Sequence, residues 1–172
     1  MITQREIRKS ELSDVSAIME LIADAQQFLR SCGVDQWQDG YPTAQIIEQD
    51  IALGQSYICI EQGQVVATAV ISAAGEPTYR TIEGSWLNEN GYVVVHRLAV
   101  SASATRRGLA REMMCCAEQF AHSLGLSDIR VDTHADNMVM QHLLERLDYQ
   151  LCGQITLQSQ AKRLAYHNRL KY

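Results

Sequence analysis

The stretch Tyr92-Val-Val-Val-His-Arg-Leu-Ala-Val100, continuing as Ser-Ala-Ser-Ala-Thr-Arg-Arg-Gly-Leu-Ala-Arg111, decides the fold. Its first half is almost continuously apolar, which is typical of a central strand covered on both faces. From Arg106 to Leu124 apolar residues recur on one stripe, and Gly125 ends the pattern, so a helix is predicted there. A second strand is predicted over Ile129–Thr133. This strand-helix-strand unit predicts a parallel pair with a right-handed crossover.

The segments on either side of this unit continue the alternation of strands and helices. Before it we predict a strand over Ile2–Arg8, a helix from Ser13 to Gly33, a loop over residues 34–42 and a helix between Thr43 and Gly54. These are followed by a hairpin of Tyr57–Glu61 and Gln64–Ser72. An irregular excursion over residues 73–91 comes next, with a helical piece near Pro77–Glu83. After it we predict a helix over about Met138–Leu147 and strands over Tyr149–Ile155 and Arg163–Leu170. The order predicts an α/β fold, a mixed β-sheet flanked by helices in one domain spanning residues 1–172.

Composition excludes several classes of protein. The 47% apolar residues and only two prolines in 172 residues exclude a disordered or collagen-like chain. Fifteen basic against twenty acidic residues give a net charge of −5, which argues against binding to nucleic acid or to an anionic membrane. The chain has no apolar run of membrane-spanning length and no signal layout at its start, so we expect a cytoplasmic protein. Five cysteines without a C-x-x-C motif predict neither disulfides nor a metal site.

The turn between the central strand and its helix is the predicted ligand site, because α/β folds bind ligands where strand ends meet helix starts. Unpaired N–H groups and a partial positive charge make a helix start a site for phosphate or pyrophosphate. Arg106, Arg107 and Arg111 strengthen that field, and Gly108 and Ala110 let a ligand approach the backbone. Taken alone, the same residues also fit an exposed basic turn.

Taken together, these segments resemble the GNAT superfamily of N-acetyltransferases, whose pattern is a strand ending in Val, a turn [Q/R]-x-x-G-x-[G/A] and a long helix. The turn falls on Thr105-Arg-Arg-Gly-Leu-Ala110, after the strand His96–Val100. Asp132-Thr-His-Ala-Asp-Asn137, with Leu143–Tyr149 after it, is similar to the family's later strand, Asn-led helix and closing Leu-Gly-Phe. Thr105 departs from the usual Gln or Arg, Arg106 from a frequent Gly, and Asp148 from another frequent Gly.

The resemblance implies a GNAT-like acyltransferase fold with acetyl-CoA as co-substrate. In the family, backbone groups of the strand pair with the pantetheine arm, the turn holds the pyrophosphate, and the Asn contacts the pantetheine. The implied donor site consists of Leu98, Ala99, Val100, Arg106, Arg107, Gly108, Leu109, Ala110, Arg111 and Asn137.

Acetyl transfer to an amine needs a base of pKa near 7, because free primary amines titrate near pH 10. His96 and His134 are the candidates, although either could equally be a buried histidine held by hydrogen bonds. A backbone N–H near Ala99 or Val100 would meet the developing oxyanion. Leu144 occupies the position of the family's usual Tyr acid, so another group protonates the thiolate or the thiolate leaves unassisted.

The loop after the first long helix combines carboxylates with aromatic rings, which suits a cationic amine. Asp35, Trp37 and Tyr41 are the predicted acceptor contacts, and Trp86 completes the wall. A small amine or amino acid is the first choice of acceptor, and a protein N-terminus or lysine is the second. Two alternatives remain open: a CoA-binding regulatory module without turnover, and an interaction protein whose basic turn binds another anion. The chain is expected to be a monomer or a homodimer.

Overall fold

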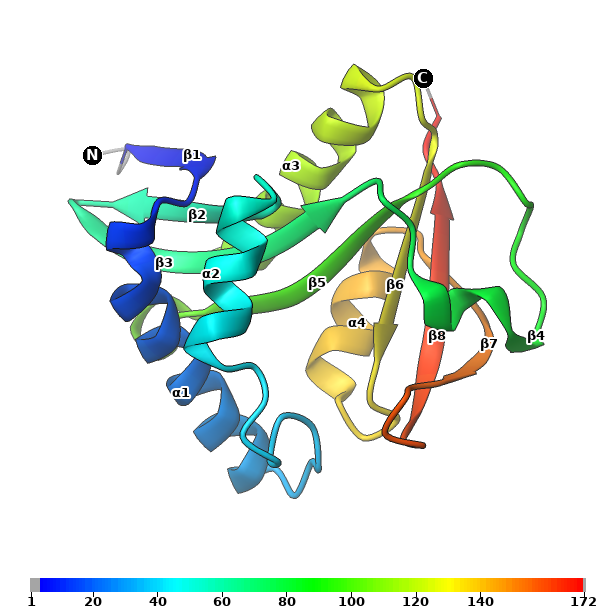
Figure 1. Cartoon of the computed structure of the whole chain (residues 1–172), viewed down its shortest axis with the longest axis horizontal. Helices are drawn as coiled ribbons and strands as arrows, with labels where there is room; N and C mark the ends of the chain where they lie inside the picture. Colours follow the sequence, from blue (N-terminus) through cyan, green and yellow to red (C-terminus); the bar gives the residue numbers. More distant parts are fainter. Residues whose placement is uncertain (1–3, 172) are drawn as a thin grey trace. The chain divides into compact units, whose positions relative to one another are not determined.

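A computed structural model describes residues 4–171 (Figure 1). In chain order its elements are β1 (Arg5–Lys9), α1 (Val15–Ser31), α2 (Ala44–Ala52), β2 (Ser56–Glu61), β3 (Gln64–Ser72), β4 (Ile82–Gly84), β5 (Val93–Val100), α3 (Leu109–Ser123), β6 (Asp128–Thr133), α4 (Met138–Arg146), β7 (Gln150–Thr156) and β8 (Lys162–Arg169). Short 3-10 turns lie at Leu12–Asp14, Pro77–Arg80 and Ala102–Ala104. Residues 2 and 3 of the first predicted strand lie outside the described residues.

The strands form one mixed sheet in the order β1-β2-β3-β5-β6-β8-β7-β4, so the predicted α/β class is confirmed. The chain divides into two compact units. The first unit comprises residues 1–71 and 97–116, and the second unit comprises residues 72–96 and 117–172. Strand β5 contributes its first half to the second unit and its second half to the first. That residues 1–172 form a single domain stays a prediction.

In the first unit, β1, β2 and β3 form an antiparallel meander, as the hairpin spacing predicted. Gln62 and Gly63 close the hairpin with φ of 52° and 77°, the left-handed pair that suits a two-residue turn. Ile18 and Ile22 of α1 lie four residues apart and so share one helix face. They pack with Ile47 of α2 and Ile58 of β2 into a core cluster, which joins both helices to the meander.

In the second unit, β5 and β6 pair in parallel through Val93 with Ile129 and Val94 with Arg130, as predicted. Strands β6, β8, β7 and β4 then pair antiparallel. Its core cluster consists of Tyr79, Trp86, Val94, Ile155 and Ala165. Tyr79 of the 3-10 turn and Trp86, which follows β4, therefore pack against Val94 of β5, Ile155 of β7 and Ala165 of β8.

Two sequence predictions need correction. The helix predicted from Arg106 begins at Leu109, because Arg106 and Gly108 both adopt left-handed backbone conformations, with φ of 62° and 81°. The excursion contains β4 as well as a 3-10 turn, where only a helical piece was predicted. A strand of three residues is too short to show the alternation that identifies strands.

Candidate active site

The turn that leads into α3 exposes backbone groups at its tip. Ala102–Ala104 form a 3-10 turn closed by the N–H of Ala104 donating to the carbonyl of Ser101 at 2.9 Å. The left-handed conformations of Arg106 and Gly108 then redirect the chain into the helix. Backbones that mix right- and left-handed residues in this way form concave nests of N–H groups that bind anions.

The first turn of α3 has N–H groups without an intrahelical acceptor. The first helical bond runs from the N–H of Glu112 to the carbonyl of Gly108 at 3.0 Å, so the N–H groups of Leu109, Ala110 and Arg111 precede it. Gly108 has no side chain to cap them, and a Cβ built on it would meet nothing within 4 Å. The space that an anion needs beside this helix start is therefore open.

The three arginines of the turn have different environments. Arg106 and Arg111 are exposed. The guanidinium of Arg107 lies 2.5 Å from Glu61 of β2, and its carbonyl accepts a hydrogen bond from Arg5 of β1 at 3.2 Å. Glu61 also accepts from Arg5 at 2.9 Å, and the two arginines, Arg5 first, lower the pKa of its carboxyl. Arg107 therefore anchors the turn to β1 and β2, a role the sequence did not indicate.

The second half of β5 carries the residues predicted to meet the pantetheine arm. Ala99 is buried, and Leu98 and Val100 are half-buried. The strand ends where the N–H of Ser101 donates to the carbonyl of Val66 in β3 at 2.9 Å. The strand predicted to meet the pantetheine arm thus runs directly into the predicted pyrophosphate turn within the first unit.

Arg97 interrupts this strand with a left-handed backbone, φ 52°. Its guanidinium donates to Asp50 of α2 at 2.8 Å and lies 5.3 Å above the ring of Tyr41. A fixed cation therefore already occupies one face of the ring that was predicted to stack on an acceptor amine. No sequence signal identified Arg97, because non-glycine residues rarely adopt this conformation within a strand.

His96 lies at the end of the β5 segment in the second unit, between two carboxylates. Its Nε2 is 3.2 Å from Glu76, which precedes the 3-10 turn, and its Nδ1 is 4.0 Å from Asp132 of β6. The hydroxyl of Tyr79 donates to the same Asp132 oxygen at 2.7 Å. The imidazole is 27% exposed, so a small molecule can reach it. Of the two candidate bases, His96 is the one set between carboxylates.

Sequence reasoning missed Glu76 and Asp132. Glu76 accepts hydrogen bonds from His96 and from the N–H and hydroxyl of Thr78, and these bonds, that of His96 first, lower its pKa to about 2. Glu76 lies in an irregular segment that contains Gly and Pro, and no sequence pattern there indicated a functional residue. Asp132 could have been found, because it stands at the carboxyl end of a predicted strand, where ligands bind.

His134 and Asn137 are engaged in local structure at the start of α4. The Nδ1 of His134 accepts from the backbone N–H of Asp136 at 3.1 Å, which leaves the ring proton on Nε2. The side-chain oxygen of Asn137 caps α4 by accepting from the N–H of Met140 at 3.2 Å. Leu144, at the family's usual Tyr position, is fully buried.

The predicted acceptor loop is fastened to α1 by amide side chains. Gln38 accepts from Arg30 at 2.9 Å and donates to the carbonyl of Gln26, and Gln26 donates to the carbonyl of Tyr41, both at 3.0 Å. Asp35 is exposed, and Trp37 and Tyr41 are half-buried.

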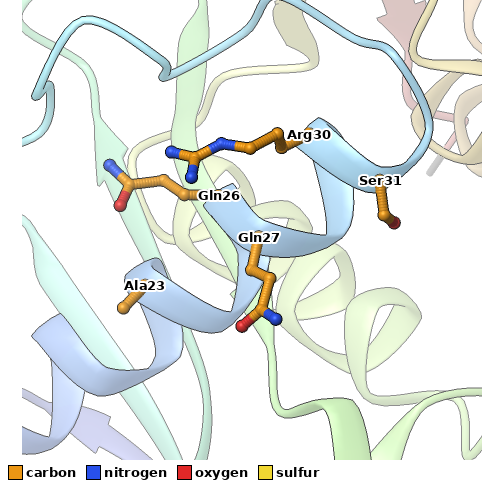
Figure 2. Close-up of a pocket in the computed structure, with 5 residues that line it drawn as sticks. All are labelled: Ala23, Gln26, Gln27, Arg30 and Ser31. Carbon is orange, nitrogen blue, oxygen red and sulfur yellow. The ribbon is translucent and has the colours of Figure 1, made fainter.

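An open hollow of about 450 Å³ lies along the surface of α1. Gln26 and Arg30 point to the same side of the helix in Figure 2. The lining residues of the hollow are Ala23, Gln26, Gln27, Arg30 and Ser31. None of them is acidic, so the hollow does not provide the carboxylate expected at an amine site.

Trp86 lies in the core of the second unit rather than at an open wall. It is 8% exposed, its Nε1 donates to the carbonyl of Tyr79 at 2.9 Å, and the guanidinium of Arg130 lies 4.4 Å from its ring centroid. This buried position does not support the predicted contact of Trp86 with the acceptor.

Neither a metal cluster nor a membrane span occurs in the described part of the chain. Within residues 4–171, no three side chains among His, Cys, Asp and Glu are arranged to hold a metal ion. No helix in the same range has both the length and the apolarity needed to cross a membrane.

Comparison with known proteins places this geometry among acetyltransferases. The profile of the acetyltransferase (GNAT) family matches residues 20–149. The uncharacterized N-acetyltransferase YesJ of Bacillus subtilis (strain 168) is 26% identical over 142 residues, covering 81% of this chain and 78% of YesJ. An acetyltransferase of the GNAT family from Streptococcus agalactiae 2603 is 34% identical, with a TM-score of 0.88, and the match covers 100% of this chain and 99% of that one.

A more distant structure shares the fold alone. It is the PaiA N-acetyltransferase of Thermoplasma acidophilum in complex with coenzyme A, which is 11% identical with a TM-score of 0.74. The match covers 96% of this chain and 99% of that one.

Proposed function

The chain belongs to the acetyltransferase (GNAT) family, and from this premise we propose that it transfers an acetyl group from acetyl-CoA to a primary amine by direct attack in a ternary complex. A small amine or an amino acid is the proposed acceptor. The structure of PaiA in complex with coenzyme A supports the choice of donor.

The turn before α3 is the observation that carries the proposal. It combines free N–H groups at a helix start, a glycine beside open space, and the exposed side chains of Arg106 and Arg111. A pyrophosphate fits these features because its charge is met by backbone dipoles and by two cations. Leu98, Ala99 and Val100 precede the turn on β5, where their backbone would hold the pantetheine arm.

His96 is the proposed base. An amine must lose a proton before its nitrogen can attack the thioester carbon, and the imidazole of His96, flanked by Glu76 and Asp132, can accept that proton. A backbone N–H near Ala99 or Val100 is the proposed oxyanion donor. Because the buried Leu144 offers no proton, we propose that the thiolate is protonated by another group or leaves unassisted.

Calorimetric titration with acetyl-CoA, dephospho-CoA and inorganic phosphate tests whether the chain binds acetyl-CoA as the acetyl donor. We expect Arg106→Ala/Arg111→Ala to weaken acetyl-CoA binding about tenfold, because two exposed cations near the pyrophosphate are lost. Arg146→Ala, an exposed arginine on α4, is the matched control and should bind like the wild type.

Two results would count against the proposal. Absence of acetyl-CoA binding at millimolar concentration contradicts an acetyltransferase, and equal binding of phosphate indicates a general anion site. Tight binding without release of free CoA across a panel of amines, amino acids and peptides favours a regulatory CoA-binding module, the alternative that Leu144 suggests.

A further inference from the structure

Two carboxylates from different segments of the chain flank the imidazole of His96. Glu76 lies in the excursion between β3 and β4, and Asp132 lies in β6. The distances are 3.2 Å from Glu76 to Nε2 and 4.0 Å from Asp132 to Nδ1, so only Glu76 is within hydrogen-bonding range. The two ring nitrogens therefore have different environments.

Glu76 is held in place independently of His96. One of its carboxylate oxygens accepts from the N–H of Thr78 at 3.1 Å and from the Thr78 hydroxyl at 2.9 Å, and its own N–H donates to the Tyr92 hydroxyl at 3.3 Å. The other oxygen faces His96. The local fold of the excursion thus fixes where this oxygen points.

The ionisation of Glu76 determines which ring nitrogen carries the proton. Its pKa is lowered to about 2, so it is a carboxylate at neutral pH and can only accept a hydrogen bond. The Nε2 of neutral His96 must then be the donor, which leaves the lone pair on Nδ1. Asp132 does not impose a tautomer, because its oxygen lies 4.0 Å from Nδ1, beyond hydrogen-bonding range.

We propose that Glu76 is a positioning residue that holds His96 as the Nε2–H tautomer, so that Nδ1 takes the proton from the acceptor ammonium. This inference rests on the proposed function. The N–H bond of the ammonium breaks and an Nδ1–H bond forms, which leaves an imidazolium between Glu76 and Asp132. The amine nitrogen then bonds to the acetyl carbon as the C–S bond breaks. Its second proton goes to the sulfur, and His96 releases the first proton to water.

The charged groups around the ring favour this step. The carboxylates of Glu76 and Asp132 favour a positive charge on the ring, and Tyr79, whose ring centroid lies 6.3 Å from that of His96, donates its hydroxyl to Asp132. The guanidinium of Arg130 lies 4.0 Å from the ring centroid of Tyr92, whose hydroxyl accepts from the N–H of Glu76. The arrangement follows the logic of a catalytic triad, in which a carboxylate fixes the tautomer of a histidine without itself taking a proton.

Glu76→Gln tests the proposal, with Glu76→Asp as the conservative variant. The control is Glu89→Gln, which removes an exposed carboxylate from the same excursion. Ring nitrogen NMR of His96 reports the tautomer without any need for turnover. We expect the wild type to carry the proton on Nε2, and Glu76→Gln to give a mixture of tautomers, because an amide both donates and accepts.

Acetyl transfer from acetyl-CoA to a responsive amine is then measured against pH. We expect Glu76→Gln to lower kcat about 10- to 100-fold, as for other groups that orient a reactive side chain, with KM for acetyl-CoA changed less than about twofold. The acid limb of the profile should also change, because the carboxylate 3.2 Å from the Nε2 of His96 is gone. Glu76→Asp should restore part of both effects, and Glu89→Gln should match the wild type.

The outcomes separate the two proposals. A wild-type proton on Nδ1, or a Glu76→Gln variant with unchanged tautomer, kcat and acid limb, overturns the role of Glu76. If the wild type shows the Nε2–H tautomer but transfers no acetyl group to any amine, the proposed function fails while the control of the His96 tautomer by Glu76 stands. A fall in kcat with an unchanged pH profile and tautomer indicates a merely structural role, which also contradicts positioning.

Discussion

Arg107 was predicted to strengthen the positive field at the start of a helix, but its contacts in the structure are with residues distant in the chain. It was grouped with Arg106 and Arg111 because all three surround one helix start. Its guanidinium instead pairs with Glu61, which the antiparallel register sets opposite Arg5. This pairing joins residues about fifty positions apart, so no local pattern could reveal it. The close approach of a ligand to the backbone at Gly108, by contrast, was predicted from the glycine, and the structure has open space there.

Glu76 gives a prediction for stability at low pH. Its pKa of about 2, against an ordinary 4.5, arises because the hydrogen bonds of His96 and Thr78 outweigh burial. A lowered pKa stabilises the fold above the ordinary value, and that stability is lost as the pH falls through the folded-state value. At neutral pH the contribution is at most about 3 kcal/mol.

Urea unfolding of the wild type and Glu76→Gln at several pH values measures this contribution. We expect the wild type to be the more stable protein above about pH 4.5, and the difference to vanish by about pH 2. A difference that stays constant over this range would show that the carboxylate does not gain stability from its ionised form.

At the scale of elements, the start of helix α3 and the existence of strand β4 show what hydrophobic patterns in the sequence can and cannot predict. The apolar stripe of α3 begins at Leu109, so periodicity alone places the helix correctly, and the prediction from Arg106 counted residues that belong to the turn. The shape of the turn proposed to bind the pyrophosphate depends on the left-handed residues Arg106 and Gly108 before the helix. Sequence patterns did not predict strand β4, because its three residues form a strand only through their pairing with β7.

Gly153 of β7 and Gly84 of β4 lie opposite each other where the two strands come close. A Cβ on Gly153 would lie 2.1 Å from the carbonyl oxygen of Glu83, and φ is 147°. We therefore expect Gly153→Ala to lower the free energy of unfolding by more than about 2 kcal/mol and to expose the amides of β4 to hydrogen exchange.

Gly125→Ala is the control for this substitution. Gly125 also has a positive φ, 70°, but its Cβ would meet nothing within 4 Å, so only about 1 kcal/mol of backbone strain is expected. Equal losses in the two variants would mean that strain, and not the close approach of β4 and β7, accounts for the effect.

At the scale of the whole molecule, the α/β class, the parallel pair and the GNAT family could be predicted from the sequence and are confirmed. The class and the parallel pair follow from hydrophobic periodicity, and the family follows from a resemblance carried by the turn Thr105–Ala110 and by the segments Asp132–Asn137 and Leu143–Tyr149. Asp132 could have been found at the end of its predicted strand, but its pairing with His96, the contact of Glu76 with His96 and the position of Arg97 over Tyr41 could not, because each contact joins elements distant in the chain. The acceptor, the cytoplasmic location and the oligomeric state stay predictions.

The single-domain prediction is tested by calorimetry. Strand β5 contributes residues to both compact units, so neither unit retains all its strands if the other unfolds. We expect one thermal transition whose calorimetric enthalpy equals the van't Hoff enthalpy. Two separate transitions would instead identify the units as independent domains.

The chain contains two tryptophans, and each unit holds one of them. Trp86 is shielded in an aromatic cluster beside a guanidinium, whereas Trp37 is half-buried in the loop predicted to face the acceptor. Their fluorescence can therefore be assigned by two substitutions. A Trp86→Phe protein emits from the loop alone, and a Trp37→Phe protein emits from the core alone, so the chain carries its own optical reporter for each half.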